Sequence, residues 1–310
     1  MSASEMRQVY AETLIRLAEA NPEIVLLEAD LMKAAGTRGF KERFPERTFD
    51  VGVAEANMIG IAAGLSATGK IPFTHTFACF ASRRVFDQFF ISANYARLNV
   101  KLVGSDPGIT ARYNGGTHMP FEDLGLMRII PGLVVFEPSD PVSLAQLLEE
   151  SAWRYGCSYL RLHRYAVEPR YPAPQRFTLG KGVVLRDGSD VTLIATGVVM
   201  VDEALRAAEL LAAQGIDAAV IDMHTLKPLD VELVLTYAEK TGAIVTCENH
   251  QIHNGLGSAV AEVLAEYRPT PLQRIGVRDV FGEVGPQDYL LRRFHLTAED
   301  IVAAVRRLRA

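Results

Sequence analysis

Short apolar runs alternate with helical patterns along the first half of the chain. Runs that are rich in β-branched and aromatic residues predict strands over 23–30, 47–53, 70–77, 99–105, 132–139 and 157–163. The stretches between them have apolar residues at helical spacing, most clearly over 54–68, 83–97 and 140–155. Continuous apolar strands separated by helices are typical of strands that are covered on both faces. The pattern therefore predicts a mainly parallel sheet.

A second unit of the same kind follows a proline-rich segment. The segment EPRYPAPQRF (168–177) has three prolines in ten residues, which is typical of a linker. After it, strands are expected over 191–196, 217–223, 243–249 and 272–277, and helices over about 198–214, 230–241, 256–267 and 297–309. The predicted fold class is α/β, with two doubly wound α/β domains in series over 1–167 and 178–310.

Composition and charge exclude several classes of protein. The sequence has 310 residues, 49% of them hydrophobic, and a net charge of −5, which argues against a general nucleic-acid or membrane-surface binder. No apolar run reaches the ~18 residues of a membrane span, and the polar N-terminus lacks the apolar core of a signal peptide. The three cysteines are far apart, so neither a disulfide framework nor a Cys-x-x-Cys metal site is predicted. We therefore expect a cytoplasmic protein.

One acidic residue, Glu55, stands where the pattern predicts apolar surroundings. It lies in GVAEANMIGIAAGL, between a short strand and a glycine-spaced helix, and no lysine or arginine follows it until Lys70. On position alone, it is an acidic residue in the first turn of a helix, where the helix dipole favours it by ~0.3–1 kcal/mol. The apolar flanks favour another interpretation: a carboxylate in an apolar pocket that shares a proton with a bound base.

Two other stretches have candidate chemistry near strand ends, where open α/β sheets bind ligands. Phe77 and Phe80 fall where a strand gives way to a helix, so they either pack in the core or stack on a flat heterocycle. His118 follows a glycine pair in YNGGTHMPFED. It is either incidental or a proton donor or hydrogen-bond partner for a substrate.

Two further patterns do not predict a site. HQIH (250–253) has a histidine pair at i, i+3 without an evident third metal ligand, so we predict no metal site in this chain. GLGSAV (255–260) has only part of the glycine spacing of a dinucleotide-binding loop, and we interpret it as the tight start of a helix.

These stretches together make the chain resemble the C-terminal part of transketolase over nearly its whole length. The motifs are GVAEANMIGIAAGL, HTFACFASRRVFDQ, GGTHMPFEDLGLMRIIPGLVVFEPSD, YLRLHR and VTCENHQIHNGLGSAVAEVL, in family order. The resemblance implies a pyrimidine-binding domain of thiamine-diphosphate enzymes followed by the transketolase C-terminal domain. The family's N-terminal domain, which holds the diphosphate through Mg²⁺ or Ca²⁺, has no counterpart. We therefore expect a separate N-terminal partner subunit that supplies most of the metal ligands, and an α2β2 assembly.

The resemblance implies roles for residues at the cofactor. Glu55 aligns with the catalytic carboxylate that hydrogen-bonds a ring nitrogen of the aminopyrimidine. Phe77 and Phe80 align with aromatic residues that pack on the same ring, and Arg83 stands where the family often has a third aromatic residue. His118 aligns with a histidine that contacts the substrate.

Other aligned positions concern the substrate. Arg164 aligns with an arginine that binds the phosphate of sugar phosphates, and Arg161 is a second candidate beside it. Asn114 replaces an aspartate that contacts a donor hydroxyl, and Asp106 stands about where many members have a phosphate-contacting histidine. An acid there would repel a phosphate dianion, which Arg112 in the same loop would partly offset.

These features predict the C-terminal subunit of a split transketolase, which transfers a two-carbon ketol unit from a ketose to an aldose. Because of the substitutions, the expected substrate differs from the usual pentose and hexose phosphates. It would be an unusual ketose phosphate, a sulfonated sugar or an unphosphorylated sugar. Two alternatives remain open: the beta subunit of a 2-oxo acid dehydrogenase, and a non-catalytic subunit that regulates a transketolase.

Overall fold

The computed structural model describes residues 3–171 and 175–309, and the chain forms two compact units. The first unit comprises Met1–Pro107 and Leu126–Leu179, and the second comprises Gly108–Gly125 and Gly180–Ala310. The segment 108–125 therefore packs with the second unit, although it comes from the first half of the sequence. Of the predicted linker 168–177, residues 172–174 lie outside the described residues.

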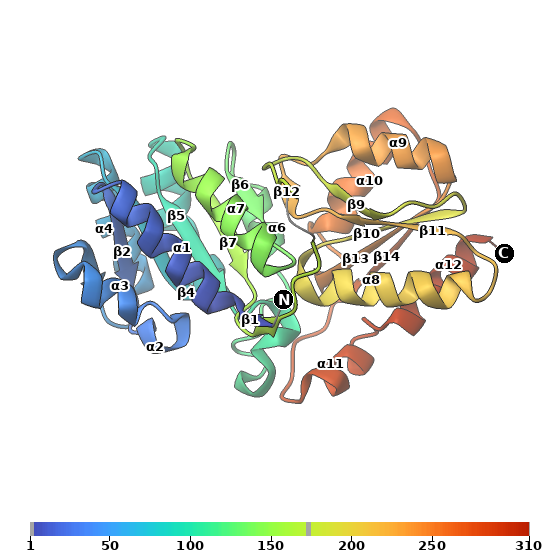
Figure 1. Cartoon of the computed structure of the whole chain (residues 1–310), viewed down its shortest axis with the longest axis horizontal. Coiled ribbons are helices and arrows are strands. Elements are labelled where there is room, and N and C mark those ends of the chain that lie inside the picture. Colours follow the sequence, from blue (N-terminus) through green and yellow to red (C-terminus); the bar gives the residue numbers. More distant parts are fainter. Residues whose placement is uncertain (1–2, 172–174, 310) are drawn as a thin grey trace. The chain divides into compact units, whose positions relative to one another are not determined.

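A parallel sheet forms the centre of the first unit (Figure 1). Within this unit the strands lie in the order β6-β7-β5-β4-β2-β3, and each neighbouring pair is parallel. Every residue of β2, β5 and β7 is buried, as expected for strands covered on both faces. The strands are β2 (Ile24–Glu28), β3 (Thr48–Asp50), β4 (Ile71–Phe77), β5 (Lys101–Ser105), β6 (Val134–Phe136) and β7 (Ser158–Leu162). A separate antiparallel pair joins β1 (Ser4–Glu5) to β8 (Ala166–Val167).

Helices cover this sheet. α1 (Met6–Ala20) packs along α7 (Pro141–Trp153), and α4 (Glu55–Ala67) packs against β4 (Figure 1). The helix expected over 83–97 begins earlier, at Phe80, and has a π-helical turn on each side of the short α5. Such turns are often found at functional sites. The other helical segments are α2 (Met32–Ala35), α3 (Arg38–Arg43), η1 (Pro45–Arg47), the π-helical η2 (Phe80–Arg84), α5 (Phe86–Gln88), the π-helical η3 (Phe89–Tyr95) and α6 (Asp123–Arg128).

The second unit also has a central sheet, in the order β14-β13-β10-β11-β9. Its strands are parallel except for β9, which runs antiparallel to β11. Helices α8 and α12 pack together, and α9 packs with α10 (Figure 1). The strands of this sheet are β9 (Val183–Arg186), β10 (Val191–Ala195), β11 (Ala218–Asp222), β13 (Ile244–Gln251) and β14 (Leu272–Val277), and the short β12 (Thr225–Lys227) is not part of it. The helices are η4 (Gly108–Asn114), α8 (Gly197–Ala212), α9 (Val231–Thr241), α10 (Leu256–Tyr267), α11 (Gln287–Arg293) and α12 (Ala298–Arg309).

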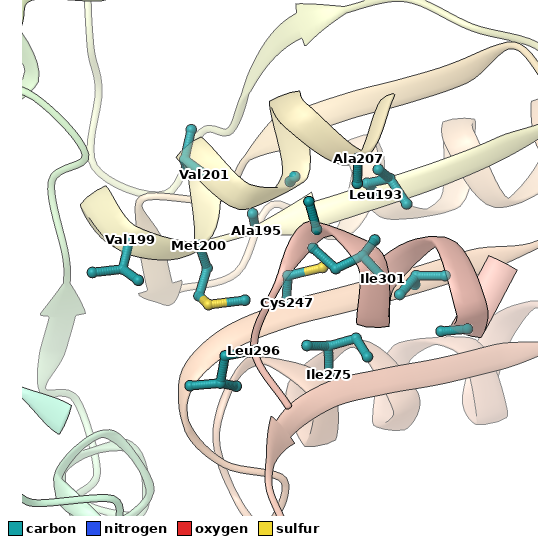
Figure 2. Close-up of a cluster of buried hydrophobic side chains, with 14 of the residues drawn as sticks. Leu193, Ala195, Val199, Met200, Val201, Ala207, Cys247, Ile275, Leu296 and Ile301 are labelled. Carbon is teal, nitrogen blue, oxygen red and sulfur yellow. The ribbon is translucent and has the colours of Figure 1, made fainter. Parts of the chain in front are cut away.

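The core of the second unit lies between its sheet and the helices α8 and α12. Figure 2 shows Leu193 from β10, Cys247 from β13 and Ile301 from α12 in this cluster. Buried side chains from 108–125, among them Ile109 and Met119, belong to the same cluster. The predicted α/β fold class with parallel sheets is confirmed in both units. In the described part of the chain, no helix has the length and apolar character needed to cross a membrane.

Truncating this core should destabilise the second unit. Leu193→Ala removes a completely buried side chain, and the lost contacts should lower the free energy of unfolding by about 2–5 kcal/mol in urea titrations. Leu210→Ala on α8 is the matched control, because Leu210 is 40% exposed and its loss should change stability by about 0.5 kcal/mol or less. Equal losses in the two variants would contradict the assignment of Leu193 to the core.

Candidate active site

The carboxyl ends of the strands in the first unit have several buried or half-buried ionisable side chains. β2 ends at Glu28, Asp106 directly follows β5, and Arg164 lies two residues after β7. The chain pairs β2 with β3 on one side and with β4 on the other, so the topological switch point lies between β2 and β4. Ligands of open α/β sheets bind outside the carboxyl ends of strands at such a point.

Glu55 is the first residue of α4 and is only 2% exposed. The preceding Ala54 provides no side-chain cap. The carboxylate of Glu55 is thus the negative group at the positive end of the helix. The predicted burial of this carboxylate is confirmed.

Arg84 is a partner of Glu55 that the sequence analysis missed. Its Nη1 donates to Oε1 and Oε2 of Glu55, at 2.8 Å from each. The pocket predicted to be apolar therefore contains one positive side chain at the carboxylate. The two residues are 29 positions apart, and Arg84 lies beyond Lys70, at the end of the π-helical turn η2. The immediate flanks of Glu55 could not reveal this contact, although a buried carboxylate requires a partner or a proton.

Phe77 and Phe80 lie side by side at the end of β4. Their ring centres are 6.3 Å apart, with an angle of 49° between the planes, and both side chains are half-buried. Arg83 is exposed, and its Nε lies 3.5 Å from the carbonyl oxygen of Cys79. The phenylalanine pair thus offers an apolar surface beside Glu55, and Arg83 lies one residue before the arginine that contacts Glu55.

Asp106 and Arg164 form an ion pair. The distance from Arg164 Nη2 to Asp106 Oδ2 is 2.9 Å. Asp106 is 1% exposed and has a φ of 56°, a left-handed conformation in which few residues other than glycine occur. Because Asp106 partly neutralises Arg164, an anion that approaches Arg164 meets a smaller net positive charge than an isolated arginine would supply.

A continuous series of contacts joins these residues. Arg84 Cζ lies 4.0 Å from the centre of the Phe80 ring, and Arg164 Cζ lies 5.8 Å from the centre of the Phe77 ring. The first unit therefore brings a carboxylate, an aromatic surface and an arginine–aspartate pair into one array. In order, the array consists of Glu55, Arg84, Phe80, Phe77, Arg164 and Asp106.

Arg161 lies apart from this array. Its side chain is completely buried on β7, and its Nη1 donates to Glu137 Oε1 at 2.8 Å. A sugar phosphate cannot reach a guanidinium in this position. We therefore leave Arg161 out of the proposed substrate site and assign it to the support of β7.

The other predicted substrate residues lie in the segment 108–125 of the second unit. Arg112 donates from Nη2 to Gln287 and has a φ of 45°. Asn114 is exposed at the end of η4. His118 is half-buried, and its Nδ1 is 2.8 Å from the hydroxyl oxygen of Thr117.

The residues that hold this segment come from the end of β13, in the ENHQIH stretch. Ile109 N–H donates to Asn249 Oδ1 at 2.9 Å, and Gly125 N–H donates to His250 Nε2 at 3.2 Å. A Cβ on Gly116 would lie 2.3 Å from the carbonyl oxygen of Gly282, so this position admits only glycine. His250 thus has a structural role that its histidine-pair motif did not indicate.

A second buried polar cluster, which the sequence analysis did not single out, joins β2 to β4. Glu28 and His75 are neighbours in register, with 4.0 Å between Glu28 Oε1 and His75 Nδ1. Thr37 donates to the Glu28 carboxyl, and Tyr10 packs edge-on against His75. Burial raises the pKa of Glu28 to about 8, and burial together with Arg164 lowers the pKa of His75 to about 3. At pH 7 the pair is therefore mainly neutral. The one signal for it in the sequence is an acidic residue that ends an otherwise apolar run.

Comparisons with known families cover most of the chain. Residues 2–169 match the family described as "Transketolase, pyrimidine binding domain", and residues 180–301 match "Transketolase, C-terminal domain".

Similar proteins include separate subunits. The 6-deoxy-6-sulfo-D-fructose transketolase subunit SqwH of Clostridium sp. (strain MSTE9) is 55% identical over 299 residues, which are 96% of this chain and 92% of that protein. An apulose-4-phosphate transketolase subunit of Phocaeicola vulgatus is 35% identical over 88% of this chain and 87% of that protein. A solved structure described as "Split gene transketolase, inactive beta4 tetramer" is 45% identical, with a TM-score of 0.90 over 98% of this chain and 97% of that chain.

Glu28→Gln should remove a pH dependence of stability. An unfolded glutamate titrates near 4.5 and Glu28 in the folded chain at about 8. Between these pH values the folded chain binds one proton more, so the free energy of unfolding falls as the pH rises. Glutamine does not titrate. Between pH 5 and pH 9, the wild type should therefore lose about 2–4 kcal/mol of stability relative to the variant in urea titrations.

Glu46→Gln is the control for this measurement, because Glu46 is exposed. Its pH profile should follow that of the wild type. If the Glu28→Gln profile also follows the wild type, Glu28 does not hold a proton in the folded chain at neutral pH.

Proposed function

The chain belongs to the transketolase family, and from this premise we propose that it is the C-terminal subunit of a split, thiamine-diphosphate-dependent transketolase. It transfers a two-carbon ketol unit from a ketose to an aldose, together with a separate N-terminal subunit. The observation that carries the proposal is Glu55: a buried carboxylate at the start of α4, beside an aromatic pair, within the pyrimidine-binding domain.

The residues around Glu55 suit the aminopyrimidine ring of thiamine diphosphate. A buried carboxylate can share a proton with a ring nitrogen, and the faces of Phe77 and Phe80 can cover a flat heterocycle. When bound, the cofactor supplies the electron sink for cleavage and formation of the carbon–carbon bond. Glu55 would hold the proton at the ring, and the phenylalanines would orient the ring and exclude water.

The polar residues of 108–125 are proposed to contact the sugar. His118 would donate a hydrogen bond to a hydroxyl or carbonyl oxygen, and Asn114 would accept or donate at a neighbouring hydroxyl. Since an asparagine is neutral, it binds a hydroxyl without adding negative charge near the substrate.

The proposed donor is a ketose that ends in a sulfonate. A sulfonate has one negative charge at pH 7, whereas a phosphate monoester has about −1.5 to −2. Arg164 is already paired with Asp106, so the pair suits a monoanion better than a dianion. The 55% identical relative is named for 6-deoxy-6-sulfo-D-fructose, which supports the same assignment.

A partner subunit is proposed to complete the enzyme. The similar beta tetramer is described as inactive, and the similar sulfosugar and apulose phosphate enzymes are both described as subunits. We propose an α2β2 assembly in which the partner holds Mg²⁺ and the diphosphate of the cofactor.

Reconstitution with the product of a neighbouring open reading frame tests the proposal. With thiamine diphosphate, Mg²⁺, a sulfonated ketose as donor and an aldose as acceptor, the mixture should be active and this chain alone inactive. Glu55→Gln should lower kcat by about 10²–10⁴-fold, because glutamine cannot share the proton. Glu46→Gln, at an exposed position, should leave kcat unchanged.

Other outcomes would support the alternatives. Full activity of Glu55→Gln would indicate a regulatory subunit, and turnover of a 2-oxo acid in place of a ketose would indicate a dehydrogenase beta subunit.

Asp106 should set the choice between sulfonate and phosphate. Asp106→Asn leaves Arg164 with its full charge, so the ratio of kcat/KM for sulfonated over phosphorylated ketose should fall about ten-fold, or about 1.4 kcal/mol. Glu149→Gln removes a carboxylate from an exposed pair with Arg16 and should leave the ratio unchanged. A ratio that stays constant in Asp106→Asn would exclude the charge of Asp106 as the basis of selectivity.

A further inference from the structure

Arg84 contacts both oxygens of the carboxylate on which the proposed function depends. The two distances from Nη1 are 2.8 Å, and Glu55 is 2% exposed, so this ion pair is the main polar environment that the structure shows for the carboxylate. A ring nitrogen that accepts a hydrogen bond needs a protonated carboxyl as its donor. A carboxylate in an ion pair with a guanidinium has no proton to donate.

The same arginine also covers an aromatic face. Arg84 Cζ lies 4.0 Å from the centre of the Phe80 ring, a cation–π contact. Arg84 therefore uses the two surfaces that the pyrimidine ring is proposed to use: the carboxyl of Glu55 and the face of Phe80. A flat heterocycle and this guanidinium cannot both occupy them.

Arg84 is able to leave this position. Its side chain is 44% exposed, whereas the Glu55 side chain is 2% exposed. The carboxylate is fixed at the start of α4, but the guanidinium can move into water without losing its charge. Of the two partners, the arginine is the one that can be exchanged.

We propose that Arg84 is a positioning residue that competes with the pyrimidine ring of the cofactor for Glu55 and Phe80. The inference rests on the proposed function. Arg84 holds the carboxylate in place until the ring displaces it. In the exchange, the N–H···O bonds from Arg84 to Glu55 break, Glu55 takes up one proton from solvent, and it donates that proton in a new hydrogen bond to the ring nitrogen. Arg84 remains protonated and becomes solvated.

A purely structural ion pair would behave differently. It would stabilise the contact between α4 and η2, and its loss would reduce stability without improving the binding of any ligand. Competition predicts the opposite sign for cofactor affinity. The affinity of the assembled enzyme for thiamine diphosphate therefore distinguishes the two roles.

The test measures the binding of thiamine diphosphate with Mg²⁺ to the chain assembled with its partner, by titration calorimetry. Arg84→Met removes the charge and keeps an apolar side chain, and should lower the Kd about ten-fold if the paired state holds about nine-tenths of the free molecules. Arg84→Lys keeps a charge but loses the planar group, and should give an intermediate Kd. Arg16→Met breaks an exposed 2.8 Å pair with Glu149 and should leave the Kd unchanged.

The number of protons taken up on cofactor binding is a second measurement. A purely structural ion pair would not change this number. Titrations in buffers of different ionisation enthalpy should show uptake of about one proton when the wild type binds the cofactor. The Arg84→Met variant should take up less, because it has no ion pair to break when the ring binds. Arg84→Lys gives the same comparison if the methionine variant fails to fold.

Two results would overturn the inference: an unchanged or higher Kd in Arg84→Met and Arg84→Lys, or binding by the wild type without proton uptake. If the wild type binds the cofactor normally and the variants do not differ from it, the inference about Arg84 is wrong but the proposed function is not contradicted. If neither the wild type nor the Arg84 variants bind the cofactor with the partner present, the proposed function fails with it.

Discussion

Charged side chains cannot remain unpaired in the interior at the carboxyl ends of the parallel strands, and this constraint arranges the candidate site residues of the first unit. Glu55 is paired with Arg84, and Asp106 with Arg164, because an isolated buried charge would be strongly destabilising. Glu28 satisfies the same constraint in the other way, by remaining protonated at neutral pH. Glu55 and Asp106 therefore already have an internal partner. A ligand that binds at either residue would have to exchange partners with it and would not fill an empty charged pocket.

The proposed substrate residues of the second unit are held in a different way. Arg112 and His118 lie in a segment without regular strands, and its position depends on hydrogen bonds to Asn249 and His250 and on the close approach of Gly116 to the 282 backbone. Side-chain amides and imidazoles thus fix a loop that a sheet does not support. The HQIH stretch has a histidine pair like that of a metal-binding motif. Here its His250 accepts a hydrogen bond from the backbone N–H of Gly125.

The regular parts of the fold could be predicted from the sequence because their patterns are local. The helix over 256–267 and the strand over 272–277 have the predicted bounds, and the burial of Glu55 followed from its apolar flanks. The partner of Glu55 could not be predicted, since Arg84 is 29 residues away and is presented by an irregular π-helical turn. The pairing of Asp106 with Arg164 depends on the left-handed backbone at Asp106 and on the adjacency of β5 and β7. Such contacts come from tertiary packing and leave no periodic signal.

The segment 108–125 also affects the order in which the chain can fold. Ile109 and Met119 belong to the core of the second unit, yet they are synthesised well before β10, β13 and α12, against which that core is built. Contacts that span so many residues form late and slowly, because a long loop has to close first. A nascent chain would expose these apolar side chains until the C-terminal strands emerge. Completion of the second core thus waits for the synthesis of α12.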